Sequence, residues 1–260
     1  MSVEARSWHS SVFVQWALPA ALVALWETLS QFGLISNRIL PAPSAVLLAG
    51  WKLALTGELW RNIGVSFLRA TTGLVIGGSL GFILGLTNGL SKGFERATDT
   101  LIQMVRNVPH LALIPLVILW FGIDETAKIF LVVLGVFFPI YINTLHGIRT
   151  VDPQLIEMAK TYGMSRWELF WRVILPGALP SIFVGLRYAL GFMWLTLIVA
   201  ETIAASSGIG YMAMQAREFL LVDIVVLSIL IYALLGKVAD STARLLERSC
   251  LSWHPAFQRR

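Results

Sequence analysis

Charged side chains are rare in the apolar parts of this sequence, and Arg69 and Glu201 stand out among them. Each lies in a different apolar run, near the end of that run expected at the outer face of a membrane. A charge inside a membrane span costs roughly 2.5–3.5 kcal/mol on insertion scales unless it is paired or placed at the interface. We therefore predict an ion pair between Arg69 and Glu201, the alternative being separate contacts with the interface. If they are partners, exchanging the two charges should restore more than the sum of the two single changes allows.

A second group of polar and aromatic residues could line a path for a small anion. Its candidate members are Arg106, Asn107, His110, Asn143 and Trp194. Arg106 is the best candidate for contact with an anion, although its side chain could also extend to the inner interface. The histidine and the tryptophan are also compatible with ordinary packing. No metal site is predicted, because the chain has 1 Cys and its 4 His are scattered.

The composition indicates an all-α membrane protein. Hydrophobic residues make up 57% of the 260 residues and charged residues 13%, whereas an ordinary soluble domain has about 25% charged residues. A helix that crosses the bilayer needs about 20 apolar residues. Six segments qualify as predicted transmembrane helices: 12–32, 64–90, 101–121, 127–147, 181–203 and 221–243.

The distribution of basic residues predicts the orientation. Six spans place both termini on one side, and most Lys and Arg of the connecting segments fall on that side. The exceptions are Arg38, Lys52, Arg61 and Arg217. By the positive-inside rule both termini are cytoplasmic. The net charge of +5 is thereby attributed to topology and lipid contact, and not to nucleic-acid binding.

Three regions are expected along the chain. Residues 1–60 hold the first span and an amphipathic helix on the outer surface, which should begin after Pro41 and Pro43. Residues 61–245 form the transmembrane core, and residues 246–260 a cytoplasmic tail. A cleaved signal peptide is the alternative for the first span, but its apolar run continues through Trp26 and Leu29.

Glycines recur at every fourth position in the second span, at 73, 77, 81, 85 and 89. Small residues at this spacing let two helix backbones approach closely in lipid. We predict a packing face, with a direct role in the path as the alternative.

The loop 150–180 is far longer than a helix–helix connection requires. Asp152 and Pro153 are typical of a helix start, and Gly163 of a helix end with positive φ. Ser165 and Glu168 form a capping-box pattern, so a second helix is expected to run to Pro176. Apolar residues of both helices, with Leu155, Ala159 and Tyr162 on one face of the first, indicate a surface for a membrane or another protein.

This loop resembles the signature of permease subunits of ABC importers, E-A-A-x3-G-x9-I-x-L-P. Glu157, Ala159, Gly163, Leu175 and Pro176 match the signature, and Met158 and Val173 depart from it. The resemblance implies a type I ABC importer permease bundle in a bacterial inner membrane. These matched residues, with Tyr162, would form the coupling helix that docks on a cytoplasmic ATPase.

The resemblance also implies the partners. The expected assembly is a homodimer of this chain with two ATPase subunits and an external, periplasmic substrate-binding protein. ATP and Mg would be bound by the ATPase, so no cofactor is expected in this chain. Consistent with a non-catalytic subunit, the sequence has no G-x4-G-K-[ST] loop.

Further motifs narrow the resemblance to permeases for aliphatic sulfonates. They are "MVRNVPHLALIPLVILWFGIDE", "LPGALPSI", "MWLTLIVAETI" and "SGIGYMAMQAREFL". Permeases for nitrate and taurine share parts of them, so these substrates remain alternatives. A secondary transporter, which would show inverted repeats and charges near the midplane, and a membrane enzyme are the hypotheses from other classes.

Overall fold

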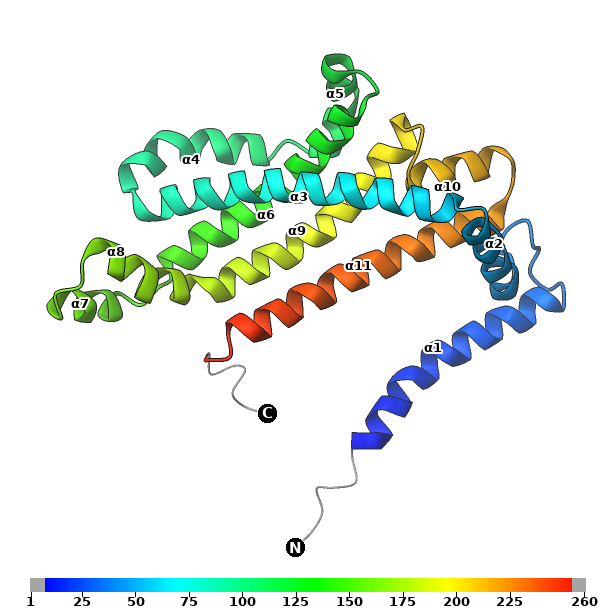
Figure 1. The fold of residues 1–260 in the computed structure, drawn as a ribbon, viewed down its shortest axis with the longest axis horizontal. Helices are drawn as coiled ribbons and strands as arrows, with labels where there is room; N and C mark the ends of the chain where they lie inside the picture. The colour runs from blue at the N-terminus through cyan, green and yellow to red at the C-terminus, as the bar shows by residue number, and fades with distance from the viewer. Residues whose placement is uncertain (1–7, 254–260) are drawn as a thin grey trace, which may run out of the picture. The chain divides into compact units, whose positions relative to one another are not determined.

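The computed structural model describes residues 8–253, and every regular element in that range is a helix. The helices are α1 (Trp8–Gln31), α2 (Pro43–Leu55), α3 (Glu58–Leu90), α4 (Lys92–Arg106), η1 (His110–Leu113), α5 (Ile114–Phe121), α6 (Glu125–Arg149), α7 (Pro153–Thr161), α8 (Arg166–Leu169), η2 (Phe170–Ile174), α9 (Leu175–Ala204), α10 (Ile209–Glu218) and α11 (Val222–Cys250). Figure 1 shows their order. They form two compact units, one built from residues up to Asn62 with Met212–Ile231, the other from Ile63–Tyr211 and the residues from Tyr232.

The predicted membrane spans are largely found as long apolar helices. Within the described residues four helices are long and apolar enough to cross a bilayer: α3, α6, the continuous helix Arg166–Ile203, and α11. The bent pair formed by Lys92–Arg106 and His110–Phe121 could make a fifth. The protein is therefore an all-α membrane protein. The first predicted span coincides with α1, and its crossing of the membrane stays a prediction.

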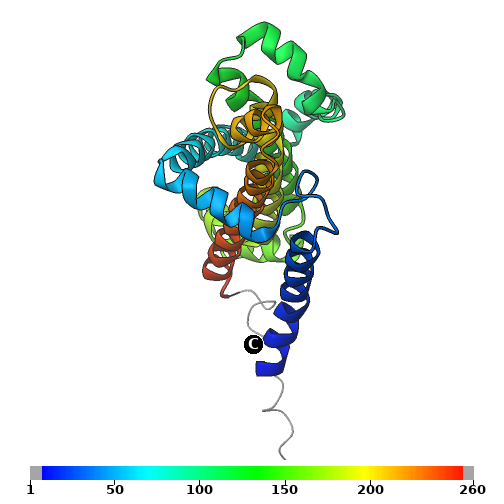
Figure 2. The same cartoon turned by 90° about the vertical axis from the view of Figure 1, so that its right-hand side faces the viewer.

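The third predicted span, 101–121, is wrong as a straight helix. The helix α4 begins at Lys92, ends at Arg106, and is followed by η1 and α5 at an angle of 78°, a turn visible at the top of Figures 1 and 2. Pro109 explains the break, because it has no N–H to donate and excludes Val108 from the helical conformation. An earlier turn at Ser91 lets α4 run back beside α3.

Glycines bring α3 and α6 into backbone contact. A Cβ atom on Gly77 would lie 2.6 Å from the carbonyl oxygen of Val133, and one on Gly81 would lie 2.5 Å from that of Phe137. Any side chain at these positions would have to separate the two helices. The contact confirms the predicted packing face, which is therefore part of the helix bundle's framework.

In the other unit, a side chain of α1 caps the N-terminus of α2. The residue before α2, Ala42, offers no side chain to cap it. Instead the carboxylate of Glu27 accepts hydrogen bonds from the backbone N–H of Ser44 at 3.0 Å and from its hydroxyl at 2.8 Å. A carboxylate at a helix N-terminus satisfies a backbone donor that the helix itself leaves open.

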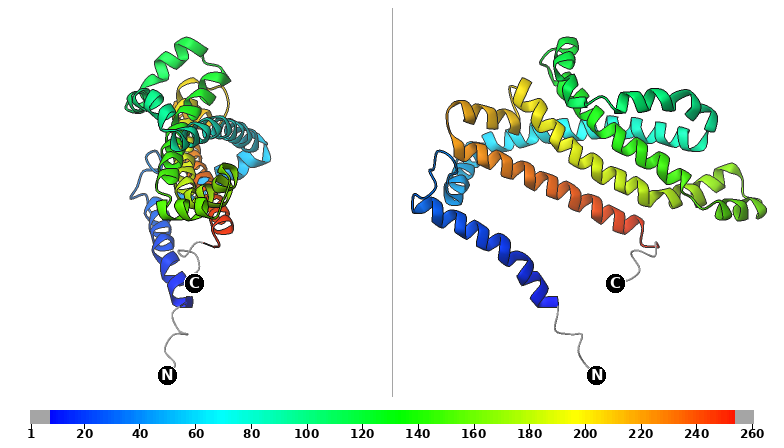
Figure 3. Two further views of the ribbon diagram at one scale, coloured as in Figure 1. Left: turned by 90° about the vertical axis from the view of Figure 1, so that its left-hand side faces the viewer. Right: turned by 180° about the vertical axis from the view of Figure 1, so that it is seen from behind.

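The hairpin of α7 and α8 lies at one end of α9 (Figures 1 and 3). Asp152 Oδ1 accepts a hydrogen bond from the N–H of Gln154 at 2.8 Å at the start of α7. Gly163 has a φ of 75° between the helices. Ser165 and Glu168 form the predicted capping box.

The expected helix end at Pro176 is wrong, because α8 continues through η2 into α9. The turn η2 is a π-helix, in which the N–H of Leu175 donates to the carbonyl of Phe170 five residues back. This wider turn ends just before Pro176, which has no N–H for the regular ladder, so the π-helical turn accommodates the proline without ending the helix.

Candidate functional site

Arg69 forms the centre of a buried ion cluster on α3. Its Nη1 donates to Glu201 Oε1 at 2.7 Å, so the structure places the two predicted partners in contact. Its Nε and Nη2 donate to the two carboxylate oxygens of Glu125, both at 2.5 Å. Arg69 is 2% exposed and Glu201 1%. Glu125 was not predicted as a partner, although it lies in the loop expected between the third and fourth spans.

Three further donors surround the carboxylate of Glu201. The hydroxyl of Ser66 lies 2.8 Å from it, the N–H of Gly210 donates to Oε2 at 2.9 Å, and the hydroxyl of Tyr232 donates to the same atom at 2.9 Å. A buried carboxylate is stable only when its lone pairs are satisfied in this way. The cluster therefore joins α3, α6, α9, α10 and α11 in one hydrogen-bonded network. This arrangement is suited to holding the helices together.

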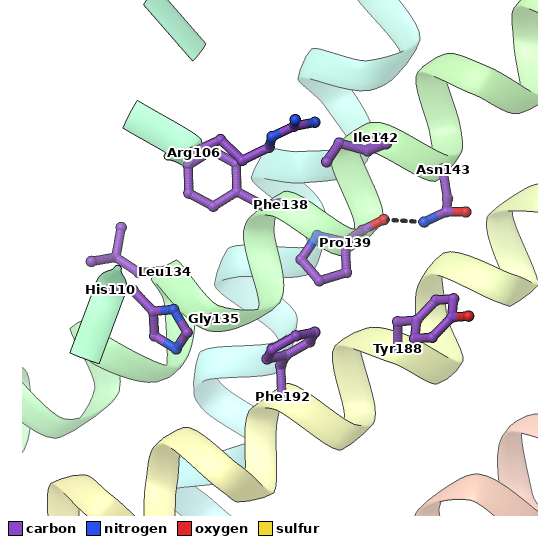
Figure 4. Close-up of a pocket in the computed structure, with 10 residues that line it drawn as sticks. All are labelled: Arg106, His110, Leu134, Gly135, Phe138, Pro139, Ile142, Asn143, Tyr188 and Phe192. Carbon is purple, nitrogen blue, oxygen red and sulfur yellow. Dashed lines mark hydrogen bonds between the residues drawn. The ribbon is translucent and has the colours of Figure 1, made fainter. Parts of the chain in front are cut away.

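A separate pocket of about 330 Å³ gathers other polar residues predicted from the sequence. Its wall is made of side chains from the break after α4, from α6 and from α9 (Figure 4). The lining residues are Arg106, His110, Leu134, Gly135, Phe138, Pro139, Ile142, Asn143, Tyr188 and Phe192. Three predicted residues of the path, Arg106, His110 and Asn143, thus meet at one site.

The break between α4 and η1 positions two of these residues. Arg106 is the last residue of α4 and His110 the first of η1, so both occupy the turn and do not lie inside a straight span as predicted. The ring nitrogen Nε2 of His110 lies 3.0 Å from the hydroxyl of Thr196 on α9. Gly135 leaves room for that contact, because a Cβ there would lie 2.7 Å from the Thr196 oxygen.

The α6 side of the pocket is shaped by Pro139 inside the helix. Pro139 has no N–H, so the carbonyl of Gly135 loses its usual donor within the helix. The side chain of Asn143 donates from Nδ2 to the carbonyl of Pro139 at 2.8 Å, which fixes the orientation of its amide (Figure 4). On the α9 side Tyr188 and Phe192 stand one helical turn apart, and Phe192 lies edge-on to His110 with ring centres 6.3 Å apart.

Two of the predicted path residues are not in this pocket. Asn107 caps the end of α4 and is exposed. Trp194 is 7% exposed and packs edge-on against Tyr232, with ring centres 6.1 Å apart. Tyr188 and Phe192 were not predicted from the sequence, although their spacing of four residues on one helix face was a usable signal.

The predicted coupling residues occupy different surroundings. Tyr162 is 79% exposed and Glu157 is exposed, whereas Ala159 is fully buried. Of the expected apolar face of Leu155, Ala159 and Tyr162, only Leu155 and Tyr162 are therefore exposed to a partner. The carbonyl of Ala159 accepts a hydrogen bond from the N–H of Met164 at 3.1 Å, where the chain turns back.

The remaining coupling candidates lie in or next to the second arm of the hairpin. Leu175 and Pro176 are half-buried at the start of α9. The aromatic side chains of Trp167 and Trp171 are exposed nearby, in contact with each other at a ring distance of 5.4 Å.

Comparison with known proteins places the chain in a family. Residues 77–251 match the model of the binding-protein-dependent transport system inner membrane component. The chain belongs to this family. It is 62% identical over 257 residues to the putative aliphatic sulfonates transport permease protein SsuC of Escherichia coli (strain K12), covering 99% of this chain and 97% of that one.

Two further relatives share less sequence identity with this chain. The putative aliphatic sulfonates transport permease protein SsuC of Bacillus subtilis (strain 168) is 45% identical over 93% of this chain and 87% of its own. The taurine transport system permease protein TauC of Escherichia coli (strain K12) is 38% identical over 92% of this chain and 89% of its own.

Solved structures show the same fold. An amino acid ABC transporter crystallised with histidines aligns with a TM-score of 0.63 at 19% identity, over 76% of this chain and 96% of that one. The methionine ABC transporter MetNI, in an inward-facing conformation, aligns with a TM-score of 0.52 at 20% identity, over 74% of this chain and 95% of that one. The fold is that of a type I ABC importer permease.

Proposed function

We propose that this chain is the pore-forming subunit of an ATP-driven importer for aliphatic sulfonates. The observation that carries the proposal is the identity of 62% with the Escherichia coli SsuC protein across nearly both full chains, against 38% with the taurine permease. Substrate-contacting and partner-contacting residues of a permease are spread along the chain, so a match over its whole length supports both. The pocket adds an arginine among apolar side chains, which suits an alkyl chain with a negative head.

The proposed partner on the cytoplasmic side is an ABC ATPase in two copies, which binds ATP and Mg. The coupling loop 150–180 would dock on it through Glu157 and Tyr162, whose exposure supports contact with a protein. Gly163, Leu175 and Pro176 would set the direction of the two arms. Ala159, being buried, would act by holding the hairpin together.

The proposed assembly in the bacterial inner membrane is a homodimer with both termini cytoplasmic. An external binding protein would deliver the substrate, so this chain would need no tight site of its own. Residues 1–60 would form the first span with the outer helix, 61–245 the transmembrane core and 246–260 the cytoplasmic tail. Arg106, His110 and Asn143 would line the path through the membrane.

Uptake by the reconstituted importer tests this function. The chain, its cognate ATPase and its binding protein are placed in vesicles, and uptake of alkanesulfonates, taurine and nitrate is measured with and without ATP. We expect ATP-dependent uptake that is fastest for alkanesulfonates. Preference for taurine or nitrate would overturn the substrate, and uptake driven by an ion gradient without ATP would indicate a secondary transporter.

A further inference from the structure

The pocket beside the α4 break combines one charge with an extended apolar wall. Arg106 is the one charged side chain among its lining residues in the part of the chain that the structure describes. Apolar side chains that also line it include Leu134, Phe138, Ile142 and Phe192. Ligand pockets of proteins have this character, with apolar walls and a few convergent polar groups that fix the orientation of the ligand.

The charge of Arg106 is available to a ligand. Within residues 8–253 no carboxylate contacts its guanidinium, whereas Arg69 contacts two. The acidic residues of α4 have other partners. Glu95 is paired with Arg149, and Asp99 accepts a hydrogen bond from Gln103 at 3.4 Å. Arg106 is exposed, so its charge stays hydrated until an anion replaces the water.

Other polar groups of the pocket are fixed in orientation by contacts inside the protein. His110 contacts Thr196 on α9, and the amide of Asn143 donates to Pro139 on α6. Both contacts are made without Arg106, so the polar side of the pocket is built before a ligand arrives. Preformed geometry of this kind lowers the cost of binding.

We propose that this pocket binds an alkanesulfonate in transit and discriminates between chain lengths, with the sulfonate group on Arg106 and the alkyl chain against Phe138, Ile142 and Phe192. The inference rests on the proposed function and makes the permease a second point of selection after the binding protein. A sulfonate carries three oxygen atoms and a negative charge that is permanent at physiological pH. The planar guanidinium offers several N–H donors in a fork that matches two such oxygens.

The apolar wall would set the chain-length preference. Each methylene group buried against it favours binding by about fourfold, until the chain exceeds the space available. Methylene groups that extend beyond the wall gain nothing, so the preferred length depends on the aromatic side chains that form the wall. Changing one wall residue should therefore shift the preferred length and not merely lower the rate.

Two wall variants test the inference in opposite directions. In the complete reconstituted importer, ATP-driven uptake is measured for methane-, butane- and octanesulfonate, and rates are compared as ratios within each variant. We expect Phe192→Ala to raise the octane-to-methane ratio several-fold and Ile142→Phe to lower it. Phe94→Ala, a comparably exposed position on α4 outside the pocket, should leave the ratio unchanged. If one wall variant fails to assemble, the other still tests the chain-length preference.

A head-group variant tests the other end of the pocket. Arg106→Gln should lower uptake of all three sulfonates by on the order of tenfold to a hundredfold, because a charge-assisted hydrogen bond is lost. Arg96→Gln, an exposed arginine of the same helix that does not line the pocket, serves as the control and should transport normally.

The outcomes separate the inference from the function on which it rests. If the wild-type importer takes up no sulfonate, the proposed function fails and the inference falls with it. If it takes up sulfonates and the wall variants keep the wild-type ratios, the function stands and the pocket is not the selective site. Equal losses in Arg106→Gln and Arg96→Gln would likewise remove Arg106 as the contact of the sulfonate group.

Discussion

Arg69 and Arg106 place the same kind of side chain in two different surroundings. Arg69 is buried and contacts two carboxylates, a backbone carbonyl and a hydroxyl. Arg106 stands at the edge of a pocket with no carboxylate in contact among the described residues. A buried arginine with every donor satisfied holds helices together, whereas an unpaired arginine beside apolar walls can take a ligand. The pairing of each arginine, more than its depth, is the reason we assign Arg69 to structure and propose Arg106 for transport.

Removal of Arg69 should have the largest effect on stability. Arg69→Met leaves Glu201 buried without a charge partner, which costs on the order of 3–5 kcal/mol in the free energy of unfolding. The measurement is the thermal unfolding midpoint and the yield of purified protein. A variant as stable as the wild type would mean that the cluster does not tie the helices together.

The surroundings of Arg69 and Glu201 lead us to expect no gain in stability when the two charges are exchanged. An arginine at position 201 would face the hydroxyls of Ser66 and Tyr232 and the N–H of Gly210, which now donate to a carboxylate. A glutamate at position 69 would face Glu125. We therefore expect the exchanged pair to be no more stable than the single variants, and recovery of stability would contradict the described network.

The glycine contact between α3 and α6 should give the next largest effect. In Gly81→Ala the new Cβ would lie 2.5 Å from the carbonyl of Phe137, and the resulting separation of the helices should cost about 1–3 kcal/mol. Gly64→Ala, on the same helix with nothing within 4 Å, should be neutral or stabilising, because alanine favours helix by about 1 kcal/mol. Equal unfolding midpoints for the two variants would rule out the close contact.

Gly163 tests the coupling hairpin. Its φ of 75° is costly for a valine by roughly 1–2 kcal/mol, so Gly163→Val should change the direction of the second arm. We expect weak pull-down of the ATPase and loss of the ATPase stimulation caused by the loaded binding protein. Gly57→Val carries the same strain at a φ of 78° outside the hairpin, and should keep the stimulation. Stimulation in both variants would show that the hairpin is not the contact.

Glu125, the exposed member of the ion cluster, should contribute least to stability. Glu125 binds Arg69 through both oxygens but is 56% exposed, so water and salt weaken its contribution. Glu125→Gln should lower the free energy of unfolding by about 1 kcal/mol or less, far below the effect of Arg69→Met. An equal loss in the two variants would mean that Glu125 is as essential to the cluster as Glu201.

Local signals predicted the hairpin and the glycine face well. Asp152, Gly163 and the capping box of Ser165 act within a few residues, and the glycines repeat at helical spacing. The ion pair of Arg69 and Glu201 was also accessible, because lone charges in apolar runs need partners.

Tertiary arrangement was harder to predict. The signal for the break at Pro109 was present in the sequence, yet the length of the apolar run outweighed it, and the wrong span hid the pocket. Glu125 lay in the loop expected before the fourth span and was overlooked as a partner of Arg69. Ala159 was counted in an exposed apolar face, because periodicity alone does not show which residues of a short helix are covered by their neighbours. Trp194 was assigned to the path by depth, whereas its contact with Tyr232 depends on helices far apart in the sequence.

The contrast between the two arginines is tested most directly by measuring stability and transport on the same preparations of Arg69→Met and Arg106→Gln. Arg106→Gln should unfold within about 0.5 kcal/mol of the wild type and yet take up alkanesulfonates at least tenfold more slowly. Arg69→Met should be clearly less stable than the wild type, so that any loss of uptake follows from loss of folded protein. Wild-type uptake by Arg106→Gln, or a loss of stability that matches its loss of uptake, would contradict the assignment of this pocket to transport.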